Sequence, residues 1–206
     1  MRTYLTILVI FTLAIVPFPT ARSRFHIPTL PQRATVLGYD RTAFGSGWAI
    51  DGTGCTTRER IVVRDLDSTQ CSPDMLPVAQ ARAGAAATGV DPFTGDVMRR
   101  EDIEIDHILP VSAAWDLGAH RWDDATRIAF YNDPLNLIAV SSAANQAKSD
   151  KLPSEWMPPN RRARCAYGTR IVEVATQYRL PLPAEDVKVI KRACSGVMGL
   201  VANQQL

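Results

Sequence analysis

The chain contains 206 residues, a length that suits one domain of ordinary size. Hydrophobic residues make up 46% of the sequence, which is enough to bury a core and excludes a largely disordered chain. The formal net charge is only +2 at pH 7, so the overall charge does not by itself indicate a protein that binds nucleic acid.

Residues 1–21 have the features of a secretory signal peptide. Arg2 precedes an apolar run from about Leu5 to Val16, which ends at Pro17. This run is short for a membrane span and matches the apolar core of a signal peptide, for which we predict cleavage near Ala21. We therefore expect a protein secreted from the cell or held in its envelope, with no stable membrane association after cleavage. An uncleaved membrane anchor is the alternative.

The rest of the chain predicts short strands in the middle with helices around them. We expect a linker at residues 22–36, a folded domain at 37–194 and a tail at 195–206. In the first half, the sequence predicts turns at 44–54, a strand at 60–66, a helix at 75–87 and a turn at 91–95. The strand at 60–66 is predicted because it contains three successive β-branched residues. In the second half, it predicts a strand at 103–109, a helix at 112–117, a helix from Asp123 or Asp124 to Tyr131, a strand at 136–140, a helix from Ser141 or Ser142 to Lys148, and helices near 166–179 and 184–194. This grouping indicates an α+β fold.

Four cysteines, Cys55, Cys71, Cys165 and Cys194, support export. Their wide spacing lacks the close ligand pairs of a structural zinc site, so two disulfides in an oxidising compartment fit better. Three pairings are possible. We favour Cys55–Cys71 with Cys165–Cys194, because the second pair would lie at the first and last residues of a helical hairpin that turns at residues 180–183.

Asp106 and His107 are adjacent on the predicted strand at 103–109 and carry the strongest chemical signal. Successive side chains of a regular strand face opposite sides, so both reach one site only where the strand twists, bulges or ends, and Pro110 makes an ending plausible. The ordinary pKa of histidine, near 6.5, suits a general base that takes a proton from water. Taken alone, the pair is better explained by a histidine packed on a sheet.

Asp106 and Asn145 are the candidate metal ligands. Carboxylate and amide oxygens suit one Mg²⁺ or Mn²⁺, and two protein ligands leave positions open for water and phosphate. Asn136 begins the second strand, where its amide or backbone carbonyl could fix the Nδ1 proton of His107 and present Nε2 to water. Taken alone, Asn145 would be a surface helix residue and Asn136 a turn residue.

Lys148, Lys151 and Arg58 are the candidate contacts to a substrate. The two lysines follow the predicted metal-binding helix and could neutralise phosphate charge. Arg58, like Arg64, could reach the scissile phosphate, although a structural salt bridge is at least as good an explanation. Basic residues are frequent at residues 148–170, where a solvated basic face is the alternative.

The order of these residues resembles the HNH endonucleases, also called ββα-metal or His-Me finger nucleases. The resemblance rests on three segments, namely Asp106-His107-Ile108 with Pro110, Asn136-Leu137, and Asn145 followed by Lys148-Ser149-Asp150. Over about residues 37–194 the chain is similar to a secreted HNH endonuclease family related to the C-terminal nuclease domain of GmrSD-type restriction enzymes. The second histidine of the HNH pattern is replaced by Asn145, as in other H-N-N variants of the superfamily.

The resemblance implies a ββα-metal core with additional helices, stabilised by disulfides. It implies that His107 is the general base, that Asp106 and Asn145 hold one Mg²⁺ or Mn²⁺, and that Asn136 positions His107. The expected substrate is DNA cut with low sequence specificity, or RNA, leaving 5′-phosphate and 3′-hydroxyl ends. A non-catalytic nucleic-acid-binding module on the same fold and a hydrolase of another phosphodiester are the alternatives.

Overall fold

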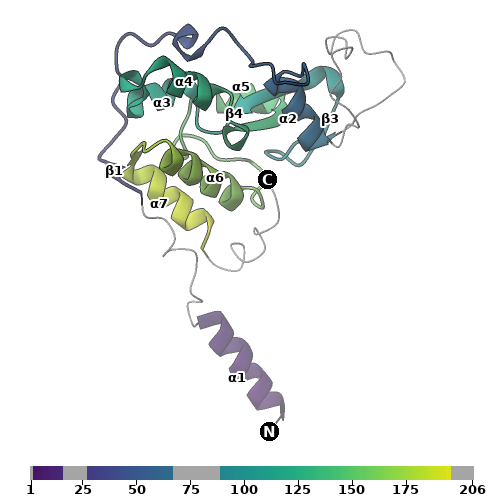
Figure 1. Ribbon diagram of the computed structural model, residues 1–206. Coiled ribbons are helices and arrows are strands. Elements are labelled where there is room, and N and C mark those ends of the chain that lie inside the picture. Colours follow the sequence, from purple (N-terminus) through teal and green to yellow (C-terminus); the bar gives the residue numbers. More distant parts are fainter. Residues whose placement is uncertain (1, 16–26, 67–88, 196–206) are drawn as a thin grey trace.

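The computed structural model describes residues 2–15, 27–66 and 89–195 (Figure 1). Its centre is an antiparallel hairpin of β4 (Ile103–His107) and β5 (Leu137–Ser141), followed directly by α5 (Ser142–Lys148). Ile103 pairs with Ser141 and His107 with Leu137, so the register is regular along the whole of β4. Helices and small sheets together confirm the α+β class expected from the sequence.

The hairpin strands are far apart in the sequence, and further helices and short strands precede, separate and follow them. The two strands are joined by α3 (Val111–Leu117), η5 (Ala119–Arg121), α4 (Asp124–Tyr131) and η6 (Pro134–Asn136). The other described elements are α1 (Arg2–Ile15), β1 (Thr29–Leu30), η2 (Arg41–Phe44), α2 (Thr57–Leu66), β2 (Gly89–Val90), β3 (Val97–Met98), η4 (Arg100–Asp102), α6 (Arg164–Gln177), β6 (Leu182–Pro183) and α7 (Ala184–Ala193).

The two faces of the hairpin pack into different clusters. Ile103 and Ile105 of β4 join a small cluster with buried residues of α2. On the opposite face, Ile138 and Val140 of β5 enter the main core, which also contains Ala144 of α5. Because side chains alternate along a strand, this arrangement places Glu104 and Asp106 on the α5 face and His107 on the α2 face.

The strand predicted at residues 60–66 is wrong, because this segment lies in α2. The Oγ1 of Thr56 accepts a hydrogen bond from the Glu59 amide (3.2 Å), and the Glu59 carboxylate accepts one from the Thr56 amide (2.7 Å). This reciprocal pattern starts a helix. Its buried residues, Ile61 and Val62, then pack on the hairpin, so their β-branched side chains serve helix packing instead of strand pairing.

The helix boundaries with polar caps agree with the sequence predictions. Asp123 accepts a hydrogen bond from the Thr126 amide at the start of α4, and Ser141 accepts one from the Ala144 amide at the start of α5. Gly118 ends α3 with a φ of 139°, a conformation that side chains with a Cβ rarely adopt.

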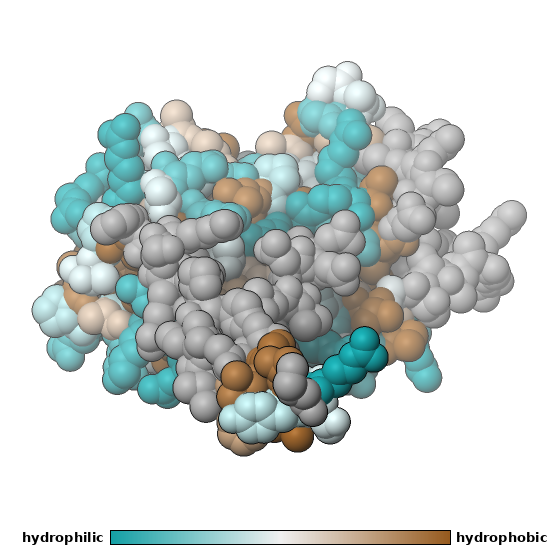
Figure 2. Space-filling view, turned by 90° about the horizontal axis from the view of Figure 1, so that it is seen from below, coloured by the Kyte–Doolittle hydropathy of each residue, from teal (hydrophilic) through white to brown (hydrophobic). Residues whose placement is uncertain are grey.

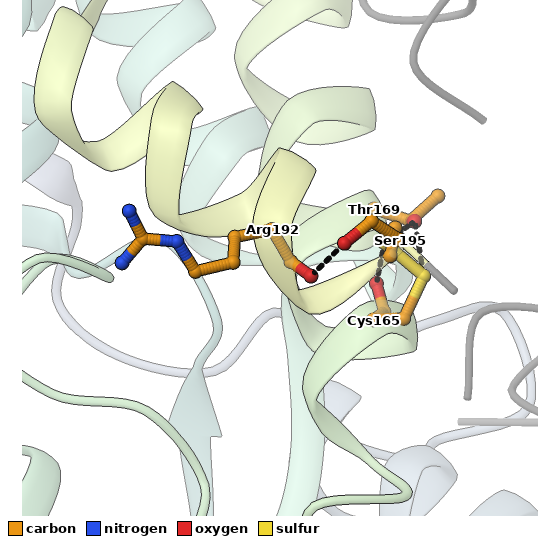
Figure 3. Close-up of a disulfide and its surroundings, with 5 residues drawn as sticks. Cys165, Thr169, Arg192 and Ser195 are labelled. Atoms are coloured by element: carbon orange, nitrogen blue, oxygen red, sulfur yellow. Dashed lines mark hydrogen bonds between the residues drawn. A yellow bond between two sulfur atoms is a disulfide. The ribbon is translucent and has the colours of Figure 1, made fainter. Parts of the chain in front are cut away.

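The C-terminal helices form the predicted hairpin, which is closed by a disulfide between Cys165 and Cys194 (Figure 3). A Cβ at Gly168 would lie 2.8 Å from Ile190, so the glycine allows α6 and α7 to approach closely. Cys55 is also disulfide-bonded. Its expected partner Cys71, the helix predicted at 75–87 and the tail after residue 195 lie outside the described residues.

The segment before residue 37 is more closely tied to the domain than a linker would be. β1 pairs in parallel with β6. The guanidinium of Arg33 lies 2.7 Å from the Asp116 carboxylate and 3.1 Å from that of Asp150. Residues 27–36, which we expected to belong to a linker, therefore pack on the folded domain.

The N-terminal helix α1 exposes apolar side chains, among them Tyr4 and Phe11. Within the described ranges, no helix has both the length and the apolar character needed to cross a membrane. The face in Figure 2 is a mosaic of hydrophilic and hydrophobic side chains, so the described atoms of that view do not form one continuous apolar surface.

Candidate active site

His107 is the last residue of β4, and its imidazole is enclosed by aromatic rings. It is only 4% exposed and stacks on Trp48, with ring centroids 5.8 Å apart and an angle of 11° between the planes. The ring of Tyr131 lies 4.6 Å away on the same side of the hairpin. The imidazole is thus held in one orientation by packing.

One ring nitrogen of His107 has a fixed partner. Nε2 lies 2.9 Å from the backbone carbonyl of Tyr131. A carbonyl oxygen only accepts hydrogen bonds, so Nε2 must carry the proton, and the lone pair of a neutral ring is on Nδ1. The sequence-based expectation assigned the opposite tautomer. The physical reason for the difference is that the orienting group is the main chain of α4.

Burial also keeps this imidazole neutral. The pKa of His107 is lowered from 6.5 to about 3, mainly by desolvation and to a smaller extent by the positive charges of Arg41 and Lys148, while the bond to Tyr131 opposes the shift. At neutral pH the ring is therefore an unprotonated base. A phosphate near the ring would raise its pKa again, because a negative charge favours imidazolium.

Asn136 does not contact the imidazole. Its Oδ1 accepts a hydrogen bond from the Leu109 amide (2.8 Å), and its Nδ2 donates one to the Leu109 carbonyl (3.2 Å). Its own backbone carbonyl accepts from the Ile108 amide (2.8 Å). The expected contact with His107 is therefore absent from the described structure. Both ends of the buried Asn136 amide are used by the backbone of Leu109, two residues after His107. It positions the histidine through the chain.

Asp106 lies on the other face of β4 and is paired with Lys148. Nζ of Lys148 is 3.0 Å from Oδ1 and 2.9 Å from Oδ2, and it also donates to the His107 carbonyl at 2.8 Å. Oδ2 receives no aligned hydrogen bond despite this short ion-pair distance. Burial raises the pKa of Asp106, and the charge of Lys148 opposes that shift.

Two of the residues expected to bind substrate have other contacts. Lys148 was expected to contact the substrate, but it is fully buried in this ion pair, so its side chain does not face solvent. Arg58 is partly buried and donates to the Ile103 carbonyl at 3.2 Å, which ties α2 to β4. Lys151 is exposed, and its Nζ donates to the Ala147 carbonyl at 2.9 Å.

Asn145 lies on α5 and faces the same side of the hairpin as Asp106. Its Nδ2 donates a hydrogen bond to the carboxylate of Glu104, two residues before Asp106, at 2.6 Å. Glu104, Asp106 and Asn145 are therefore oxygen-bearing side chains on one face. Such oxygens fit Mg²⁺ or Mn²⁺, and the unbonded Oδ2 of Asp106 could accept a cation. Residues 2–15, 27–66 and 89–195 contain no group of three His, Cys, Asp or Glu side chains arranged to hold a metal.

Arg41 lies close to both faces of the site. Its guanidinium is 5.4 Å from the centroid of the Tyr131 ring, and Nη2 donates to the Tyr131 hydroxyl at 3.2 Å. Its positive charge partly opposes the rise that burial causes in the pKa of Asp106, and it adds to the fall that burial causes in the pKa of His107, although the two side chains leave β4 on opposite sides. Arg41 is exposed and has no ion-pair partner in the described part of the chain, so it is free to meet an anion.

Sequence reasoning missed four residues of this site, and only some of them had a signal. Glu104 is one strand period before Asp106, so its position on the same face could have been inferred. Trp48 and Arg41 are distant in the sequence and are brought in by tertiary packing. Tyr131 acts through a backbone carbonyl, which any residue type supplies.

Comparison with known proteins places this chain in a family. Residues 79–182 match the family described as "GmrSD restriction endonucleases, C-terminal domain". The chain is also 33% identical over 170 residues to an "Uncharacterized secreted protein" of Arthroderma benhamiae, covering 81% of this chain and 79% of that protein. The chain belongs to the GmrSD C-terminal domain family. No solved structure matches it significantly.

Membership of the GmrSD C-terminal domain family supports a nuclease-type function for this site. The matched residues contain β4, β5 and α5, and with them Asp106, His107, Asn136 and Asn145. Arg41 and Trp48 precede the matched segment. The GmrSD-type region thus supplies the candidate ligands and base, and a separate N-terminal segment covers the base.

Proposed function

We propose that this protein is a secreted, metal-dependent endonuclease that hydrolyses phosphodiester bonds in nucleic acid, with DNA of any sequence as its main substrate. The observation that carries this proposal is the neutral imidazole of His107, whose Nε2 is fixed by Tyr131 and whose sequence neighbour Asp106 is a buried carboxylate. A general base with one defined tautomer beside a hard oxygen ligand suits phosphodiester hydrolysis.

In the proposed reaction, Nδ1 of His107 takes a proton from a water molecule as the water oxygen attacks phosphorus. The bond from phosphorus to the 3′ oxygen breaks, and that oxygen is protonated from solvent, which gives 5′-phosphate and 3′-hydroxyl ends. The imidazolium is stabilised by its Nε2 hydrogen bond to Tyr131 and by the phosphate charge. Regeneration of the base needs only loss of the proton to water.

Asp106 and Asn145 would hold the cation, with Oδ2 of Asp106 as the oxygen that lacks a hydrogen bond. The chemistry that a bound Mg²⁺ or Mn²⁺ supplies here is stabilisation of negative charge on the phosphate and the leaving oxygen. Lys148 compensates the Asp106 carboxylate within the protein and fixes the His107 carbonyl, so it organises the site from inside.

Arg41 is the candidate contact for the substrate phosphate. It is exposed, it lies near both Asp106 and His107, and a guanidinium matches the geometry of phosphate oxygens. Lys151, which is also exposed, could add charge along the nucleic-acid backbone. Secretion is supported by the Arthroderma benhamiae relative, which is named a secreted protein, and by the apolar N-terminal helix α1.

The test is nicking of supercoiled plasmid DNA by the purified protein in EDTA, Mg²⁺, Mn²⁺ or Ca²⁺. We expect cleavage with Mg²⁺ or Mn²⁺, none in EDTA, and a large loss for Asp106→Asn. Parallel reactions with single-stranded RNA and with a small aryl phosphodiester compare substrate classes. Tight DNA binding without cleavage under every condition would show a non-catalytic binding module instead, and cleavage of the small diester alone would show a different hydrolase.

A further inference from the structure

Glu104 and Asn145 form a close side-chain pair next to the proposed cation site. Nδ2 of Asn145 donates to Oε2 of Glu104 at 2.6 Å, and both side chains are partly buried. One helical turn further along α5, Lys148 pairs with Asp106. The two pairs run side by side along β4 and α5, so Glu104 and Asp106 are neighbours on one face.

The chemistry of this pair fixes which end of the Asn145 amide faces Glu104. An ionised carboxylate only accepts hydrogen bonds, so the NH₂ group must point towards it. The amide oxygen of Asn145 then points away from Glu104. This matters because a carboxamide can rotate by 180°, and only its oxygen binds a hard cation, whereas its NH₂ group repels one.

We propose that Glu104 is a positioning residue, which orients the carboxamide of Asn145 so that its oxygen is presented to a divalent cation. This inference rests on the proposed function, in which Asp106 and Asn145 hold the cation. Without Glu104, the amide would populate both orientations, and part of the protein would present the wrong end. Mutation of a residue that hydrogen-bonds a metal ligand commonly lowers metal affinity by about 10- to 100-fold.

The test compares two substitutions of similar size. Glu104→Met removes the acceptor, so Mn²⁺ affinity should fall by about 10- to 100-fold. Glu104→Gln keeps an amide oxygen that can accept from Nδ2 of Asn145, so it should retain most of the affinity. Mn²⁺ binding is measured on the purified, metal-free protein by electron paramagnetic resonance and by calorimetry, which do not depend on turnover. Glu101→Met, at an exposed residue of η4, is the control and should bind as the parent does.

Each outcome decides a different question. Parent-like Mn²⁺ binding by Glu104→Met would overturn the positioning role and leave the proposed function intact. An equal loss in both Glu104 variants would also overturn it, because the charge of Glu104 would then act on the cation directly. Failure of the parent protein to bind Mn²⁺, with Asp106→Asn unchanged from it, would instead contradict the proposed function itself.

A purely structural role is separated by thermal unfolding in EDTA. If Glu104 only joins α5 to β4, Glu104→Met should lower the unfolding temperature while its Mn²⁺ affinity stays at the parent value. If Glu104→Met does not fold, Glu104→Thr provides a shorter side chain whose hydroxyl cannot span the distance to Asn145, and the same loss of affinity is expected.

Discussion

The two faces of the β4–β5 hairpin differ in the charge of their buried ionisable side chains. On the α5 face, a buried carboxylate, Asp106, remains next to a buried ammonium, Lys148. On the α2 face, His107 lies among Trp48 and Tyr131, and burial lowers its pKa so that it stays neutral. Adjacent residues of one strand can therefore supply a cation ligand and an uncharged base, because strand alternation separates their surroundings.

The largest expected effect comes from removing the Lys148–Asp106 ion pair on the α5 face. Lys148→Met leaves the Asp106 carboxylate buried without its partner, which should destabilise the protein by about 3–5 kcal/mol. Urea unfolding at neutral pH measures this change. Lys151→Met is the matched control and should alter stability by less than about 0.5 kcal/mol, because Lys151 is exposed. A small effect of Lys148→Met would mean that Asp106 is solvated, or takes up a proton, once the ammonium is removed.

The lowered pKa of His107, on the α2 face, predicts how the free energy of unfolding depends on pH. The unfolded chain takes up a proton at His107 below about pH 6.5, whereas the folded protein takes it up only near pH 3. Stability from this group is complete above pH 6.5 and falls by about 1.4 kcal/mol per pH unit as the pH decreases towards 3. His107→Phe should remove that slope from the difference between the two proteins. Parallel stability curves between about pH 6 and 4.5 would contradict the burial of the imidazole.

A smaller effect is expected from the ring that covers the base. Trp48→Leu keeps an apolar side chain but removes the stacking contact with His107, which should cost about 0.5–1.5 kcal/mol. The ¹H–¹⁵N spectrum of the imidazole should still show the Nε2–H tautomer, because the Tyr131 carbonyl holds it. Appearance of the Nδ1–H tautomer would show that packing, and not the hydrogen bond, selects the proton position.

The smallest expected change concerns Arg41, which lies near both faces. If its guanidinium contacts phosphate, Arg41→Met should reduce the slope of DNA affinity against salt concentration by about one. Fluorescence anisotropy with a labelled duplex measures this slope in EDTA. Arg162→Met, at another exposed arginine, is the comparison and should change the slope less. Equal slopes for Arg41→Met and the parent would exclude a phosphate contact at this position.

Much of the β4–β5–α5 unit could be predicted because its boundaries are local. Asp123 and Ser141 cap their helices, and Pro110 follows the end of β4 closely. α2 was misread because three successive β-branched residues received more weight than the Thr56–Glu59 capping pattern. Local residue preference is a weak guide when tertiary packing provides a surface for a helix.

The site was less predictable than the fold, for reasons that follow from its contacts. Its residue types at positions 106, 107 and 145 could be proposed from their spacing. The Tyr131 carbonyl that fixes the tautomer of His107 has no sequence signal, since every residue has a carbonyl. The burial of Lys148 depends on how α5 lies against β4, which the sequence around Lys148 does not reveal.

The most direct measurement compares plasmid nicking in Mg²⁺ or Mn²⁺ by the parent, His107→Ala and His120→Ala. His120 is the matched control, because one of its ring nitrogens, Nδ1, bonds to the backbone carbonyl of Trp115, just as Nε2 of His107 bonds to that of Tyr131. His120 has no role in the proposed mechanism. We expect His107→Ala to lower the cleavage rate by at least about 10²-fold while Mn²⁺ binding persists, and His120→Ala to cleave as the parent does. Cleavage by His107→Ala at the parent rate would contradict the assignment of His107 as the base.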